Sequence, residues 1–236
     1  NDWVGPIEIN IEHKRMFPGD LGPSTTEMGT IAWYDDNENN RLFRETLAKL
    51  KPVLAEIRYK GDFEINCIVN ESGIYPLEIT PRFGSPIVYV HFQIHQSPWG
   101  EFLKAIADGK SYDLKWRKGY GIVVLLAVPP FPYVKKLDTI SLEGAGVFFD
   151  GVTDEDSGHI YYEGIARRPS GDLYLSDGQG YVLYSTALAD DLEKSKEQAY
   201  RIIEKIRVPK SFYRNDIGDK FIEIDCHVLR KLGYID

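Results

Sequence analysis

The chain opens with an alternation of apolar and polar residues. Ile7, Ile9 and Ile11 would share one face of a strand, and the polar residues between them would share the other. This period of two predicts a β-strand with one buried side. Because the pattern is present from the first residues, we expect that further residues precede Asn1 in the natural protein.

The next segments predict a loop and a long helix. Residues 18–30 are rich in Gly, Pro, Ser and Thr, a composition typical of irregular structure. From about residue 38 to residue 57, apolar side chains recur at helical spacing. Asp36 is the predicted N-cap, and Pro52 is expected to kink or restart the helix.

A hairpin and a second helix follow. Residues 61–69 and 74–80 alternate in polarity on either side of a short turn, which predicts two paired strands. A helix is predicted over residues 98–107, with Ser97 as its N-cap and Gly109 at its end.

The pattern changes near residue 115. Residues 121–128 predict a buried strand, and residues 190–207 predict a helix with one apolar face. Further short strands are expected at residues 146–149, 158–163, 173–175 and 181–187. The sequence thus predicts an α+β protein with two domains, residues 1–115 and residues 116–236.

Composition and charge narrow the class of protein. The 236 residues are 43% hydrophobic and carry a net charge of −8, so a nucleic-acid partner is not expected. Cys67 and Cys226 form no disulfide framework, which favours an intracellular protein with reduced thiols. The apolar run at residues 122–128 is too short to cross a bilayer. We therefore expect a cytoplasmic protein without a membrane partner.

The first candidate site begins with the adjacent cations Lys14 and Arg15. They are followed at residues 20–29 by a loop rich in Gly and hydroxyl side chains. Cations and backbone N–H groups of such a loop could hold phosphates. The alternative is a solvated loop with surface cations.

The second candidate site lies at the end of the predicted hairpin. Glu78 and Thr80 project to one face, and Arg82 follows them. Asn66 or Glu64 on the opposite strand could add an oxygen. Such oxygens can hold Mg²⁺ against ATP phosphates, and the guanidinium can neutralise a transferred phosphoryl group. The alternative is a salt bridge on an edge strand.

Other motifs carry less chemistry. Residues 176–180 predict a hairpin turn. Four histidines do not fall at metal-ligand spacings and are expected in core or surface positions: His91, His95, His159 and His227. No Walker, Rossmann or Gly-X-Ser-X-Gly pattern is present.

Taken in order, segments along nearly the whole chain resemble the phosphoribosylamine–glycine ligases, which are ATP-grasp enzymes. The run at residues 213–218, for example, resembles the family pattern F-R-x-D-I-G. The other similar segments are residues 13–15 with 20–29, 59–61, 77–78, 82–86, 97–109, 182–188 and 199–200.

The resemblance implies a fold and a reaction. Residues 1–115 would be the C-terminal lobe of an ATP-grasp module, with an antiparallel sheet and helices. Residues 116–236 would be a small β-rich C-terminal domain with one long helix. The family uses ATP and Mg²⁺ (or Mn²⁺) to join glycine to phosphoribosylamine through an acyl phosphate, in purine biosynthesis. The N-terminal substrate domain and the first ATP-grasp lobe would be missing partners, so the fragment alone is expected to be inactive.

The resemblance also implies roles for individual residues. The cations of the site would be Arg82, Lys14 and Arg15. Phosphate or substrate would contact Asp20, Gly22, Ser24, Thr25 and Gly29. The metal ligands would be Glu78 and Thr80, with Asn66 across the hairpin.

Several ligand-facing positions depart from the family pattern. Thr80 replaces an Asn ligand, and Ser85 and Ile87 replace two acids. The loop at residues 24–27 replaces the family's Asn-Thr-Gly-Gly and adds a negative charge. Two alternatives therefore stay open: a ligase for another carboxylate and amine, and a non-catalytic binding module.

Overall fold

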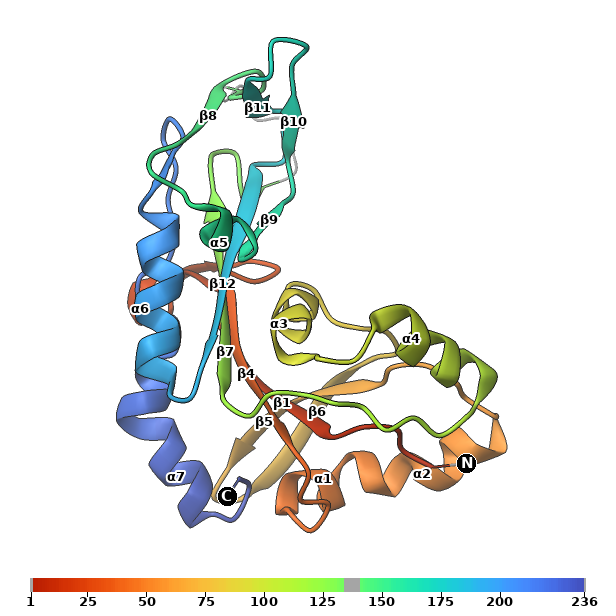
Figure 1. Ribbon diagram of the computed structural model, residues 1–236. Coiled ribbons are helices and arrows are strands. Elements are labelled where there is room, and N and C mark those ends of the chain that lie inside the picture. Colours follow the sequence, from red (N-terminus) through yellow and green to blue (C-terminus); the bar gives the residue numbers. More distant parts are fainter. Residues whose placement is uncertain (1, 134–140, 236) are drawn as a thin grey trace. The chain divides into compact units, whose positions relative to one another are not determined.

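The computed structural model describes residues 2–133 and 141–235, so Asn1 lies outside the described residues. The chain divides into two compact units. Unit 1 combines residues 1–9, 33–118 and 219–236, and unit 2 combines residues 10–32 and 119–218. Helices and antiparallel strands are mixed along the chain, which confirms the predicted α+β class (Figure 1). The predicted domain boundary at residue 115 stays a prediction.

The core of unit 2 is an antiparallel sheet built around β7 (Tyr120–Ala127). Strand β12 (Tyr181–Ala189) pairs with one side of β7, and β4 (Gly29–Asp35) pairs with the other through residues 29–32. The order of the sheet is β1-β4-β7-β12-β9, with β1 at Ile7–Glu12 and β9 at Ile160–Tyr162. Every residue of β7 after Tyr120 is buried, which is why the sequence shows a continuous apolar run there.

Helix α6 (Leu192–Ile203) packs on this sheet, alongside β7 and β12 (Figure 1). The Asp191 side chain caps it by accepting a hydrogen bond from the Lys194 N–H. The predicted helix is therefore confirmed, with shorter ends. Two hydroxyls tie it to the strands, because Ser195 Oγ donates to the Tyr120 carbonyl and Ser185 Oγ to the Ala199 carbonyl.

The remaining elements of unit 2 are short. A second sheet has the order β10-β11-β8-β13. Its strands are Ile165–Arg167, Leu173–Leu175, Gly146–Phe149 and Ile206–Arg207, and helix α5 is Asp154–Ser157. A separate hairpin consists of β2 (Arg15–Phe17), a 3₁₀ turn (Pro18–Asp20) and β3 (Leu21–Ser24). The prediction of an irregular loop over residues 18–30 is therefore wrong, because β3 and the start of β4 lie within it.

Unit 1 contains most of the helices and a two-stranded hairpin. The hairpin is β5 (Glu64–Asn70) and β6 (Gly73–Thr80), which confirms the prediction. The helices are α1 (Arg41–Glu45), α2 (Leu47–Glu56), α3 (Ile87–Ile94), α4 (Trp99–Asp108), a π-helix (Phe221–Asp225) and α7 (Cys226–Lys231). Cys67 and Cys226 are free thiols.

The predicted helix over residues 38–57 is broken in two. Its N-cap is Asn40, whose side chain accepts from the Phe43 N–H, and Asp36 has no such role. The break falls at Thr46, which leaves helical geometry at φ −121° and ψ −96°. Pro52 lies inside α2 without ending it. Thr46 Oγ1 donates to the Leu42 carbonyl at 2.6 Å, so a local side-chain bond accompanies the break.

Helix α4 confirms the second predicted helix but begins differently. Its N-cap is Pro98, because Ser97 Oγ instead accepts a hydrogen bond from the Lys115 N–H at 2.8 Å. Gly109 ends the helix in the left-handed conformation, as expected. Among the described residues, no helix combines the length and the apolar character needed to cross a bilayer.

Histidine and aromatic rings fill part of the core of unit 1. His91 is 2% exposed, and neither ring nitrogen has a hydrogen-bond partner. His95 Nε2 lies 2.6 Å from Tyr34 Oη, and the His95 ring stacks on Trp99 with 4.3 Å between centroids. Burial lowers the pKa of His91 to about 3, and that of His95 to about 4. Both imidazoles are therefore neutral in the folded chain near pH 7.

The last described residues belong to the same core. Tyr234 is fully buried, and its hydroxyl donates to the Asn70 carbonyl at 2.9 Å. The Arg41 guanidinium lies over the Tyr234 ring, 4.5 Å from its centroid. Arg41 also donates to carbonyls of residues 232 and 233. The C-terminal stretch is thus an integral part of unit 1.

Candidate functional site

The predicted metal ligands lie on one face of the β5–β6 hairpin in unit 1. Asn66 and Glu78 are direct cross-strand partners, and Asn66 Nδ2 donates to Glu78 Oε1 at 3.3 Å. Thr80 follows Glu78 on the same face and stands opposite Glu64. The strand register therefore gathers a carboxylate, an amide and a hydroxyl, as the sequence pattern predicted.

These side chains offer oxygen donors of the kind that Mg²⁺ prefers. Glu78 is exposed, so its carboxylate is open to solvent. Asn66 and Glu64 are the two residues of the opposite strand that the sequence offers as metal ligands, and Asn66 is the better candidate. Glu64 Oε1 accepts the Gly84 N–H at 2.6 Å and so fixes the loop after β6. Within the described ranges, no three His, Cys, Asp or Glu side chains gather as a metal site.

The cation Arg82 lies just beyond the end of β6. Its Nη1 donates to the Phe83 carbonyl at 3.0 Å, and the side chain is exposed. The hairpin end itself is fixed by Tyr59, whose hydroxyl lies 2.6 Å from the Asp62 carbonyl and 3.0 Å from the Pro81 carbonyl. Ile87 is only 4% exposed at the start of α3, so the position where the family has an acid serves the core here.

The predicted phosphate-binding cations lie at the start of the β2–β3 hairpin in unit 2. Lys14 Nζ is 3.1 Å from Glu12 Oε2, and both side chains are partly exposed. Arg15 Nη1 donates to the Gly22 carbonyl at 2.9 Å. Gly22 has φ +80°, a conformation that glycine adopts at low cost, and this turn brings its carbonyl to the guanidinium.

The hydroxyl-rich segment that follows is hydrogen-bonded within unit 2. Thr25 donates both its N–H and its hydroxyl to the Lys14 carbonyl, at 2.7 and 2.9 Å. Ser24 pairs with Arg15 in the hairpin register. Gly29 starts β4, and its carbonyl accepts the His13 N–H at 2.9 Å. The segment is therefore a built hairpin rather than an open loop.

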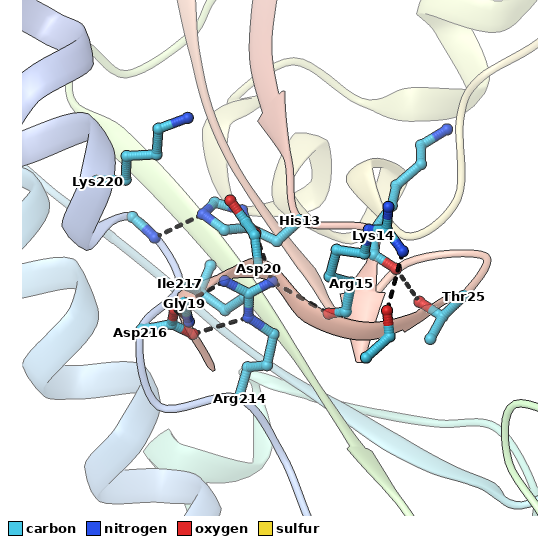
Figure 2. Close-up of polar contacts among 12 residues, drawn as sticks. His13, Lys14, Arg15, Gly19, Asp20, Thr25, Arg214, Asp216, Ile217 and Lys220 are labelled. Carbon is cyan, nitrogen blue, oxygen red and sulfur yellow. Dashed lines mark hydrogen bonds and ion pairs between the residues drawn. The ribbon is translucent and has the colours of Figure 1, made fainter. Parts of the chain in front are cut away.

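Asp20 has a partner that the sequence did not indicate. Its carboxylate forms an ion pair with Arg214, with 2.9 Å between Oδ1 and Nη1 (Figure 2). Arg214 is 2% exposed and also binds both carboxylate oxygens of Asp216, each at 2.7 Å. Burial alone would lower the pKa of Arg214, but its hydrogen bonds to Asp216 and Asp20 outweigh burial and raise it. A role for Asp20 at the phosphate stays a prediction.

His13 completes this buried polar group. It is 6% exposed, and its Nε2 accepts the Gly218 N–H at 3.1 Å (Figure 2). Burial, and then the positive charge of Arg214, lower the pKa of His13 to about 4. The imidazole is thus a neutral hydrogen-bond acceptor near pH 7. Sequence reasoning assigned no role to His13, Arg214 or Asp216, although the Arg-x-Asp spacing places a carboxylate within reach of the guanidinium.

The predicted site residues therefore form two clusters, one in each compact unit. Unit 1 brings together Glu78, Asn66 and Thr80, with Arg82 at the end of the same hairpin. Unit 2 brings together the cations and the hydroxyl-rich segment of residues 14–29. That the two clusters serve one site stays a prediction.

Comparison with known proteins identifies the relatives of the chain. Residues 123–220 match the family model described as Phosphoribosylglycinamide synthetase, C domain. A phosphoribosylamine–glycine ligase of Mycobacterium leprae is 33% identical over 229 residues, covering 91% of this chain and 50% of the relative. The chain thus spans about half the length of the curated relatives it matches.

Solved structures agree on the fold. The phosphoribosylamine–glycine ligase of Thermotoga maritima matches with a TM-score of 0.66 at 20% identity, over 92% of this chain and 57% of that one. The biotin carboxylase domain of the Hydrogenobacter thermophilus 2-oxoglutarate carboxylase matches with a TM-score of 0.50 at 15% identity, over 89% of this chain and 48% of that one. The fold is that of the C-terminal half of ATP-grasp ligases. Residues 123–220 therefore match the phosphoribosylglycinamide synthetase C domain, and the predicted resemblance of the chain to the phosphoribosylamine–glycine ligases is confirmed.

Proposed function

We propose that the chain is part of an ATP-dependent ligase that joins the carboxylate of glycine to the amine of phosphoribosylamine, a step of purine biosynthesis. The observation that carries the proposal is the similarity to phosphoribosylamine–glycine ligases along 91% of the chain. The whole reaction would need the other half of the length that these relatives have.

ATP and Mg²⁺ are the proposed cofactors. Glu78, Asn66 and Thr80 supply oxygen donors that suit Mg²⁺, and their shared face makes joint coordination feasible. The Hydrogenobacter thermophilus relative was solved in complex with MgADP and bicarbonate. When bound, the metal would neutralise phosphate charge.

The proposed reaction passes through an acyl phosphate. Transfer of the terminal phosphoryl group of ATP to the substrate carboxylate turns a poor electrophile into a reactive one, which the amine then attacks with loss of phosphate. Arg82, Lys14 and Arg15 would stabilise the negative charge on the transferred group. Arg82 in unit 1 and Lys14 in unit 2 are each accessible to solvent.

A second candidate is a related protein with a different carboxylate and amine, or a binding module without catalysis. The burial of Ile87 favours this second candidate, because the family has an acid at this position. Ser85 replaces the other acid, and Thr80 offers a shorter ligand than Asn.

Titration of Mg²⁺–ATP into the natural protein that contains these 236 residues tests the proposal. Glu78→Gln should weaken the affinity for Mg²⁺–ATP at least about tenfold, because it removes the only charged ligand proposed. Glu71→Gln, in the turn of the same hairpin, is the matched control and should change nothing. If Glu78→Gln leaves affinity and turnover unchanged, Glu78 is not a ligand. Product analysis with glycine and phosphoribosylamine separates the two candidate functions.

A further inference from the structure

A guanidinium is the largest fully buried side chain of the described residues. Arg214 uses Nε and Nη2 to bind both oxygens of Asp216, and it uses Nη1 to bind Asp20 and the Arg15 carbonyl, the latter at 3.1 Å (Figure 2). A buried charge is stable only when it is paired and hydrogen-bonded in this way. The arrangement therefore fixes the relative positions of every group that it touches.

The groups on one side of this arrangement belong to the hairpin that carries the predicted phosphate-binding cations. Asp216 Oδ2 also accepts the Gly19 N–H at 2.8 Å, and the Gly218 N–H binds His13. Together with the Arg15 carbonyl and the Asp20 carboxylate, these contacts hold the backbone of residues 13–20 along its length. Lys14 lies between two held points, His13 and Arg15, and Arg15 is held through its own carbonyl.

The groups on the other side are anchored in the core of unit 2. Tyr200 on α6 donates its hydroxyl to the Arg214 carbonyl at 2.9 Å and accepts the Ile217 N–H at 3.0 Å. Phe212 pairs with Ala127 at the end of β7 through two backbone hydrogen bonds. Residues 212–218 are thus fixed to the central sheet and its helix and can act as a rigid support.

We propose that Asp216 and Asp20 form a clamp with the buried guanidinium of Arg214, which positions the β2–β3 hairpin so that Lys14 and Arg15 are presented to phosphate. The role of the phosphate in this inference rests on the proposed function, whereas the clamp itself does not. The three clamp residues are positioning residues. The charges of Lys14 and Arg15 stay outside the clamp. Lys14 pairs with Glu12 and extends away from Arg214 in Figure 2, and the Arg15 guanidinium donates to the Gly22 carbonyl.

Asp20→Asn is the most informative substitution. The Asp20 side chain is 51% exposed, so the variant should fold, and the Arg214–Asp216 pair stays intact. Removal of a carboxylate from the hairpin would by simple electrostatics strengthen anion binding. The clamp predicts the opposite, because the cations lose their fixed positions. Asp172→Asn is the matched control, an exposed carboxylate of unit 2 that bonds only to Ser170 Oγ among the described contacts.

Hydrogen exchange measures the clamp without any ligand. Asp20→Asn should speed exchange about tenfold or more at the Gly19 and Thr25 amides, because a charge-assisted bond that holds the hairpin is lost. Arg214→Lys should have the same effect, since an ammonium cannot bind two carboxylates and a carbonyl in a fork. Asp172→Asn should leave these rates unchanged. Unchanged rates in Asp20→Asn would overturn the clamp.

Binding of inorganic triphosphate to the natural protein that contains this chain measures the consequence for the cations. Asp20→Asn should lower the affinity at least about threefold, and this loss should vanish in a Lys14→Gln background. Unchanged or tighter binding in Asp20→Asn would overturn the positioning role even if exchange is faster. If the natural protein that contains this chain binds no triphosphate while the exchange results hold, the proposed function of the cations is wrong and the clamp stands.

Discussion

Acidification should destabilise unit 1 through the buried imidazole of His91. The pKa of His91 is about 3 in the folded chain and 6.5 for an exposed histidine. Below pH 6.5 the unfolded chain binds a proton that the folded chain excludes until the pH approaches 3. The stability that depends on neutral His91 is therefore complete above pH 6.5 and declines as the pH falls from there.

The size of the destabilisation at pH 5 follows from how far this pH lies below 6.5, since the folded chain stays unprotonated until about pH 3. At pH 5, protonation of the unfolded chain favours unfolding by about 2 kcal/mol, since each unit below 6.5 contributes about 1.4 kcal/mol. His91→Phe removes this proton site and keeps a flat ring of similar size in the aromatic cluster. Between pH 7.5 and pH 5, the free energy of unfolding of the variant should fall by about 2 kcal/mol less than that of the wild type.

Tryptophan fluorescence during urea unfolding is the assay. All four Trp residues (Trp3, Trp33, Trp99 and Trp116) belong to unit 1, so their signal reports on that unit. Urea titrations at pH 7.5 and pH 5 give the free energy of unfolding at each pH. We compare the change in unfolding free energy between the two pH values, because any packing cost of the new side chain is the same at both and cancels.

His227→Phe is the control, because it makes the same change of side chain in the same unit at an exposed position of α7 and removes no buried imidazole. It should leave the pH dependence of unfolding unchanged. Equal losses of stability on acidification in the wild type and in His91→Phe would refute the argument from burial.

Three further substitutions test unit 2. Leu125→Ala, at a fully buried position of β7, should lower the free energy of unfolding by about 2–5 kcal/mol in urea titrations followed by circular dichroism. Asp156→Asn should cost about 1.5–3 kcal/mol at pH 7, because the buried carboxylate loses its charge-assisted hydrogen bond to Lys205, 2.6 Å away. The pKa of Asp156 is lowered from 3.8 to about 2, mainly by the Lys205 hydrogen bond. The difference in unfolding free energy between the wild type and Asp156→Asn should therefore be complete above pH 3.8 and fade as the pH falls through 2. Gly180→Ala should lower the melting temperature by the equivalent of more than about 1 kcal/mol, because φ is +89° and the added carbon would meet a backbone oxygen at 2.2 Å; at Gly178, where the space is open, the same change should be nearly neutral.

Periodic elements were predictable from the sequence, whereas breaks within them were not. The buried run of β7 and the alternation of the β5–β6 hairpin are local patterns, and both are confirmed. The break at Thr46 left no trace in the spacing of apolar residues. Ser97 looked like an N-cap, but its hydroxyl is taken by a backbone N–H that lies 18 positions further along the chain. At Ser97 local propensity gave way to a tertiary hydrogen bond, whereas at Thr46 a local side-chain bond accompanies the break.

The candidate site shows the same division. The pairing of Asn66 with Glu78 follows from the register of a short hairpin, so neighbouring residues were enough to predict it. The ion pair of Asp20 with Arg214 joins residues 194 positions apart. No local pattern links the two, and Asp20 alone resembled an exposed loop residue. Only the folded chain shows that this carboxylate pairs with Arg214.

The burial of Tyr234 has a consequence for synthesis on the ribosome. The ring that Arg41 covers, and whose hydroxyl binds Asn70, is made well after both of these residues, although all three belong to the same unit. During translation, the early part of unit 1 therefore stays incomplete, with an open apolar gap, until residues 219–235 are made. Unit 2, which closes at residue 218, can mature first. The order in which the two units fold would then be the reverse of the order in which their first residues are made.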